Sequence, residues 1–261
     1  QARGTRRRLM RVLFITHNYP RYAGDPVGSF VLRLAVSLKE QGIEVRVVAP
    51  SAPDLAAEES IEGIPVTRFR YVPRKLETLA YTGTMGAQVK QFWKARLAMV
   101  GFLAQGYRVA SQVLDAWPAV VVHAHWWFAS GLVARAIRAP RGIPYVVTMH
   151  GSDVRLASGA PGGETLFRQV AHRASMLTTV SSWLARQATA MDPRVTPTLV
   201  PMPVVPDMFR PEGARDGDRI LFIGKLAEQK GLHHLLRALP LMARRARVDV
   251  VGAGRVDDSK V

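Results

Sequence analysis

The feature that most restricts the fold of this chain is the repeated alternation of short apolar runs with stretches of helical periodicity. Such alternation is typical of buried parallel strands joined by crossover helices. Strands are expected over residues 11–16, 44–49, 65–71, 119–123, 144–149, 176–180 and 198–201, and helices over 30–41, 130–139 and 182–190. Ser181 or Ser182 is expected to cap the last helix. The pattern therefore predicts an α/β fold with a mainly parallel sheet that helices cover on both faces.

Composition changes near residue 202 and predicts a second domain. Residues 202–218 are rich in proline, glycine and aspartate, which favours a linker between a Rossmann-like domain over 10–201 and a new unit from 219. That unit should contain a strand over 219–223, a helix over about 231–243 and a strand over 247–251. Two strands are fewer than a Rossmann-like domain needs, so we expect the chain to end inside its second domain, at residues 219–261.

Charge and cysteine content limit the possible partners and compartments. The formal net charge is +16, to which the basic tail over residues 1–9 contributes, and it favours anionic partners such as nucleic acid, acidic lipid surfaces or phosphorylated small molecules. The chain has no cysteine, which fits a reducing, cytoplasmic compartment. Its apolar runs are shorter than the roughly 20 residues that span a bilayer.

Polar residues gather where one apolar run ends. The run that closes at Met149 is followed directly by His150, Gly151, Ser152 and Asp153. A strand buried on both faces gives no packing reason for these residues, and ligands bind at the carboxyl edge of parallel sheets. A functional loop is therefore expected here.

The order of short motifs resembles the retaining glycosyltransferases of family 4, and the resemblance covers nearly everything from Met10 onward. The motifs are L-A-x-x-L from Leu34, H-A-H from His123, H-G-S-D from His150, T-V-S-S from Thr179, P-M-P-V from Pro201 and G-K-L-x-x-x-K-G from Gly224. The resemblance implies the GT-B architecture, in which a cleft separates two Rossmann-like domains. It also implies sugar transfer from a nucleotide sugar to a hydroxyl of a glycan, lipid-linked or small-molecule acceptor.

The donor side of such a site needs positive charge, because the leaving group is a diphosphate. Lys225 and Lys230 flank one loop, and the resemblance places a basic pair there, with Gly224 and Gly28 close to the donor. No metal or cofactor is expected beyond the nucleotide sugar. Two solvated lysines, and a Gly28 that serves only its turn, fit the sequence as alternatives.

The acceptor side is expected at the H-G-S-D loop. The resemblance places His150 beside the reacting carbon of the donor sugar, with Asp153 at the acceptor hydroxyl and Ser152 in support. Asp153 could instead cap the turn after His150. His123 and His125 can share one strand face but are too few for a zinc site. His125 and Trp126 are acceptor-pocket candidates, although such an indole more often covers a core.

Residues 72–116 mix basic and aromatic side chains, which fits either a helix on an anionic membrane or a solvated helix face. Two other functions compete with sugar transfer. A nicotinamide dehydrogenase would need G-x-G-x-x-G in the first turn, which this chain lacks. A basic nucleic-acid-binding module has only the charge in its favour. The family's acidic E-x7-E motif is not found, so the 261-residue chain is expected to bind donor weakly with little turnover, or to be an inactive fragment.

Overall fold

The computed structural model describes residues 10–206, 209–210, 213 and 217–252, and the chain divides into two compact units, residues 1–204 and 205–261. The predicted basic tail over 1–9 and parts of the predicted linker lie outside the described residues.

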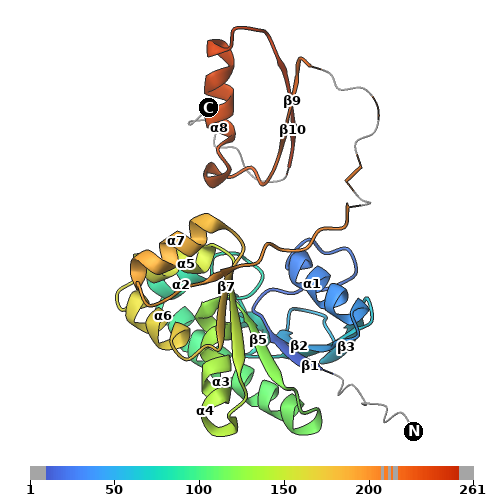
Figure 1. Cartoon of the computed structure of the whole chain (residues 1–261), viewed down its shortest axis with the longest axis vertical. Helices are drawn as coiled ribbons and strands as arrows, with labels where there is room; N and C mark the ends of the chain where they lie inside the picture. The colour runs from blue at the N-terminus through green and yellow to red at the C-terminus, as the bar shows by residue number, and fades with distance from the viewer. Residues whose placement is uncertain (1–9, 207–208, 211–212, 214–216, 253–261) are drawn as a thin grey trace, which may run out of the picture. The chain divides into compact units, whose positions relative to one another are not determined.

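The first unit is built on an eight-stranded sheet with the order β3-β4-β2-β1-β5-β6-β7-β8 (Figure 1). The strands are β1 Arg11–Ile15, β2 Glu44–Pro50, β3 Glu58–Ile61, β4 Ile64–Phe69, β5 Val121–His125, β6 Tyr145–Met149, β7 Met176–Thr179 and β8 Thr198–Leu199. Every pairing is parallel except that of β3 with β4. The predicted α/β class and the mainly parallel sheet are confirmed.

Helices bury both faces of this sheet. They are α1 Ser29–Glu40, α2 Met85–Gln91, α3 Trp93–Ala116, α4 Leu132–Arg141, α5 Ser152–Gly159, α6 Gly163–Ala171 and α7 Ser182–Met191. Alternate residues of β1 enter different cores, as strand geometry requires. Phe14 packs with Val31 and Ala35 of α1, whereas Leu13 belongs to the larger core that contains α3, α4, α6 and α7. Ser181 caps α7, since its Oγ accepts a hydrogen bond from the Leu184 amide.

The bounds of β3, α3, α5 and α6 were not predicted. Strand β3 pairs antiparallel at the sheet edge and has one buried residue, Ile61, so it lacks the apolar run expected of a buried strand. Helix α3 is apolar on more than one face, which hides its periodicity. The short helices α5 and α6 contain glycine and directly follow the H-G-S-D loop. The predicted strand 119–123 was also misplaced, because β5 runs to His125.

The second unit is a βαβ arrangement. Strands β9 Arg219–Ile223 and β10 Arg247–Val251 pair in parallel along their whole length, and α8 Leu232–Ala238 connects them. The strands are where the sequence predicted them, but the helix is shorter. A 3-10 helix, Leu239–Leu241, follows α8 with Pro240 in its first turn. Because proline cannot donate a hydrogen bond to the preceding turn, the α-helix does not continue.

Candidate functional site

The sheet order brings three chain segments to one edge. Strand β5 lies between β1 and β6, so the residues that follow these strands meet at the carboxyl edge. His17 follows β1, His125 ends β5, and His150 follows β6. Ligands bind at this edge in open α/β sheets. The sequence had singled out His125 and His150 but had not assigned a role to His17, although its place directly after an apolar strand was the available signal.

A hydrogen bond joins the two predicted site histidines. Nδ1 of His125 lies 3.1 Å from Nε2 of His150, and their ring planes are 26° apart. The ring of His123 stacks on His125 with centroids 4.4 Å apart, which confirms that these two side chains share one face. Nε2 of His123 lies 2.7 Å from Oγ1 of Thr148, a residue of β6. Contacts between β5, β6 and the loop after β6 therefore hold these rings in place. We call His17, His123, His125 and His150 the histidine cluster.

Burial keeps the histidine cluster uncharged. Burial lowers the pKa of His150 to about 3 and the pKa values of His17 and His123 to about 4. It lowers the pKa of His125 well below the usual value, and the neighbouring imidazoles add to this effect. At neutral pH each ring therefore carries one proton, so each offers one donor and one acceptor.

The surroundings of His125 favour one tautomer of the pair. Nε2 of His125 is buried and has no hydrogen-bond partner among the described residues. A buried N–H group without an acceptor is rarer than a buried acceptor without a donor. We therefore assign the proton to Nδ1 of His125, which donates to Nε2 of His150. This leaves the His150 proton on Nδ1, where it can be donated elsewhere.

Trp126 forms a wall of the cluster and is not exposed. Its indole lies 4.5 Å from the His150 ring and 4.2 Å from the His17 ring, between centroids, and Phe30 lies 4.9 Å from His150. Trp126 is 5% exposed and has φ +70°. A bulky residue in the left-handed region is strained, which is typical of residues held at functional sites. As in the core-covering alternative, the side chain packs beneath the site; its predicted role in acceptor binding remains a prediction.

Asp153 holds the loop by hydrogen bonds to the backbone. Its buried carboxylate accepts from the amides of His150 and Gly151, at 3.2 Å and 2.9 Å, and from the amide of Trp127 at 3.3 Å. Burial raises the pKa of this carboxyl, while the backbone donors oppose the shift. This is the turn-capping geometry that the sequence left open beside acceptor binding. Ser152 is exposed and begins α5.

Gly28 is required by its own loop. It has φ +73°, and a Cβ there would lie 2.6 Å from the carbonyl oxygen of Asn18 and 2.8 Å from Cα of Tyr19. No side chain fits at this distance. The contact holds the loop after β1 against the start of α1, so the turn role is observed, whereas a backbone contact with donor remains a prediction.

The predicted basic loop belongs to the second unit. Gly224 directly follows β9, both Lys225 and Lys230 are exposed, and Lys230 ends a short 3-10 helix, Glu228–Lys230. The amide of Ala227 donates to the carbonyl of Lys225, and the amide of Lys230 donates to that of Ala227. These turns keep both lysines on the one loop between β9 and α8.

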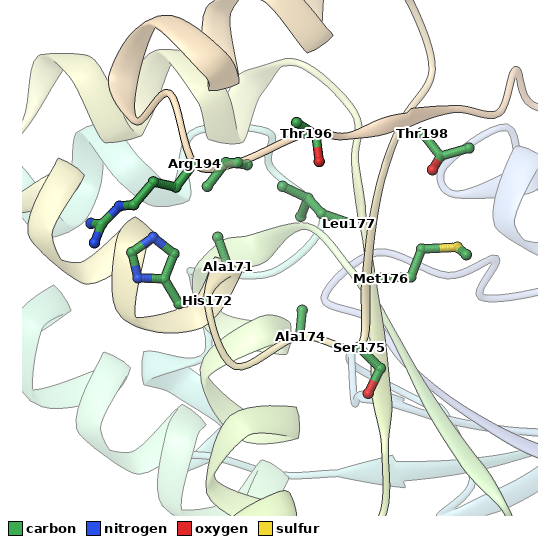
Figure 2. Close-up of a pocket in the computed structure, with 10 residues that line it drawn as sticks. Ala171, His172, Ala174, Ser175, Met176, Leu177, Arg194, Thr196 and Thr198 are labelled. Carbon is green, nitrogen blue, oxygen red and sulfur yellow. The ribbon is translucent and has the colours of Figure 1, made fainter.

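A separate pocket of about 530 Å³ lies at the opposite, amino edge of the first sheet (Figure 2). Met176 and Thr198, the first residues of β7 and β8, line it, as do His172 and Arg194. Asp192 accepts hydrogen bonds from both His172 and Arg194, at 2.9 Å and 3.1 Å. We call His172, Asp192 and Arg194 the Asp192 cluster.

The described residues contain neither a metal-binding cluster nor a membrane-spanning helix. No group of three or more His, Asp or Glu side chains there is placed to hold a metal ion. Within the same residues, none of the helices is both long and apolar enough to cross a bilayer.

The sheet and the following βαβ unit define an α/β protein of the GT-B type. Similar solved structures include sucrose-phosphate synthase from Thermosynechococcus elongatus, with a TM-score of 0.68 and 14% identity over 96% of this chain and 64% of that one. Another is HepE from Anabaena in complex with UDP, with a TM-score of 0.62 and 14% identity over 96% of this chain and 63% of HepE. At these identities the likeness concerns the fold.

Residues 27–203 match the family described as the glycosyl transferase 4-like domain, and the chain belongs to this family. Among curated proteins it is 25% identical to TuaC of Bacillus subtilis, named for teichuronic acid biosynthesis, over 94% of this chain and 66% of TuaC. It is 26% identical to glycogen synthase of Mycobacterium tuberculosis, over 95% of this chain and 63% of that protein. The chain thus spans slightly less than two thirds of the length of these relatives.

Proposed function

We propose that this chain is the acceptor-side part, with the start of the donor-side part, of a cytoplasmic glycosyltransferase. The enzyme moves a sugar from a nucleotide diphosphate donor to a hydroxyl acceptor with retention of configuration. The observation that carries the proposal is the uncharged His125–His150 pair at the carboxyl edge of a sheet in this family. The names of the relatives and the UDP and UDP-glucose complexes of HepE support a nucleotide-sugar donor.

In this proposal His150 is the catalytic residue and acts without a charge. Because its Nε2 accepts from His125, its Nδ1–H is the group that donates to a sugar hydroxyl or to the departing oxygen. His125 is a positioning residue that fixes the tautomer and the ring plane of His150. Asp153 sets the backbone of the same loop through its three amide hydrogen bonds.

The two lysines of the loop after β9 bind the donor in this proposal. Lys225 and Lys230 bind the donor diphosphate, and the backbone at Gly224 allows the phosphates to approach. Their charge balances the leaving group, and we propose that transfer proceeds without an added metal or cofactor. Equal transfer with and without a chelator tests that part of the proposal.

Calorimetric titration with a panel of nucleotide sugars tests donor binding. We expect weak binding by the 261-residue chain, tighter binding by a version extended through the rest of the second domain, and about tenfold loss in Lys225→Ala. Lys225→Arg keeps the charge and is the matched control. Unchanged affinity in Lys225→Ala contradicts the donor assignment, and strong turnover by the 261-residue chain contradicts the expected need for the rest of the domain.

Nuclear magnetic resonance of 15N-labelled histidine tests the pair without an activity assay. We expect the His150 signals of the Nδ1–H tautomer at neutral pH, and a mixture of tautomers in His125→Phe. The Nε2–H tautomer in the unsubstituted chain contradicts the assignment to Nδ1.

A further inference from the structure

Helix α3 carries an apolar stripe on its solvent side. The stripe consists of Trp93, Leu97, Val100, Ala104 and Tyr107, spaced four and three residues apart, as one face of a helix requires. The exposed fractions are 65% for Trp93, 61% for Leu97 and 65% for Val100. Phe92, directly before the helix, is 52% exposed. Side chains that favour burial therefore lie in solvent along several turns.

The opposite face of the same helix is already used by the core. Met99, Phe102 and Val109 are buried against the sheet. A helix on the surface of a soluble domain normally presents polar side chains on its other face, and a helix apolar on both faces is normally covered. The stripe is therefore a surface that lacks its partner in the described part of the chain.

The charges around the stripe identify the chemistry of that partner. Between Glu77 and Asp115 the sequence contains no acidic residue. It contains four basic ones there, Lys90, Lys94, Arg96 and Arg108. All four are exposed. Nζ of Lys94 lies 5.8 Å from the ring of Trp93, so cation and indole occupy one patch. An aromatic and aliphatic stripe with basic flanks and without acids matches an anionic lipid surface.

The amino end of the stripe lies at the edge of the sheet that carries the histidine cluster. Trp117, at the carboxyl end of α3, donates a hydrogen bond to Glu44 at the start of β2, so that end of α3 lies at the amino edge. Trp93 lies at the other end of this 24-residue helix. Nearby α2 packs on α3, and a Cβ at its Gly86 would touch Leu156 of α5, the helix that follows the His150 loop.

We propose that the α3 stripe docks the protein on an anionic membrane surface. A second copy of the chain is the weaker partner, because pairing two stripes would bring together two sets of four cations without an acid between them. If the proposed function holds, docking brings a membrane-borne acceptor toward the carboxyl edge. Docking itself does not depend on sugar transfer, so its test can fail or succeed independently of that function.

The test measures binding of the chain to vesicles of phosphatidylcholine with and without phosphatidylglycerol. We expect binding only to the anionic vesicles, with affinity that falls as salt rises. Trp93→Ser/Leu97→Ser and Lys90→Gln/Lys94→Gln should each weaken it at least tenfold. Trp183→Ser, at a tryptophan of α7 that is 50% exposed, is the matched control and should bind normally. Circular dichroism verifies the fold of each variant.

Brominated lipids locate the contact. They should quench part of the tryptophan fluorescence in the unsubstituted chain and in Trp183→Phe, and much less of it in Trp93→Phe. Binding that is unchanged in Trp93→Ser/Leu97→Ser overturns the proposal, since it would then come from another basic region such as residues 1–9. Absence of vesicle binding, or a dimer in light scattering that the same double variant abolishes, overturns it as well.

Discussion

Two edges of one sheet use histidine in different ways. At the carboxyl edge, four histidines lie together, His125 buried and the other three half-buried, and the Asp153 carboxylate of the same loop accepts from backbone amides. At the amino edge, His172 lies against the Asp192 carboxylate, with Arg194 and Arg168 beside it. The buried imidazoles of the carboxyl edge can present a donor to a ligand, whereas the His172 ring is engaged by a hydrogen bond to a carboxylate that two arginines also contact. The comparison separates a candidate reaction site from a structural cluster.

Substitution of His150 and of His172 should give the largest difference in kcat/KM between the two edges. In a version extended through the second domain, His150→Ala should lower kcat/KM for sugar transfer by about 100-fold or more, because a positioned donor is lost. His150→Asn, which keeps an amide donor near the place of Nδ1, should lose less. His172→Ala should stay within about twofold. Equal losses at both edges would contradict the assignment of the reaction to the carboxyl edge.

Alanine substitution of two glycines with positive φ should lower the free energy of unfolding by different amounts. Gly28→Ala should cost about 3 kcal/mol in free energy of unfolding, since its Cβ would collide with Asn18 and Tyr19. Gly142, with φ +67° before β6 at the amino edge, has open space around it, so Gly142→Ala should cost about 1 kcal/mol. Urea denaturation gives both values, and a similar cost at both positions would show that the Gly28 loop can relax.

Acidification should destabilise the fold through the carboxyl edge. The folded pKa values of His17 and His123 are about 4, below the usual 6.5, so between these limits the unfolded chain binds more protons than the folded chain. The contribution of these two histidines to the free energy of unfolding should therefore be fully present above pH 6.5 and should decrease as the pH falls toward 4. His123→Phe should flatten this dependence, measured as the urea midpoint against pH. A profile as steep as that of the unsubstituted chain would argue against a buried neutral His123.

The smallest effect is expected at the amino edge. The side chain and amide of Arg194 hold the pKa of Asp192 below its usual value, so Asp192 adds stability above its unfolded pKa of about 3.9 and loses it as the pH falls through the folded value. Asp192→Asn should be slightly less stable at neutral pH, with the difference shrinking in acid, and donor binding should not change. Altered donor affinity would show that the two edges are coupled.

The sequence predicted much of this arrangement because its signals are local. Strand β1 is a continuous apolar run after its first residue, and the N-cap of α7 is a serine beside a helical pattern. The placement of His150 and Asp153 after β6 followed from the end of such a run. Strand β3 lacks an apolar run, and helix α3 is apolar on two faces, so the sequence indicated a helix within residues 72–116 but not its bounds.

By itself, the sequence determined the α/β class, the parallel sheet and the residues that occupy its carboxyl edge, because these depend on the spacing of apolar and polar side chains along the chain. Only the tertiary structure decided what those residues do to one another. It placed His17 beside Trp126, joined His125 to His150, turned Asp153 toward the backbone and left the α3 stripe in solvent. The reason is physical: hydrogen bonding, burial and pKa depend on neighbours that are distant along the chain.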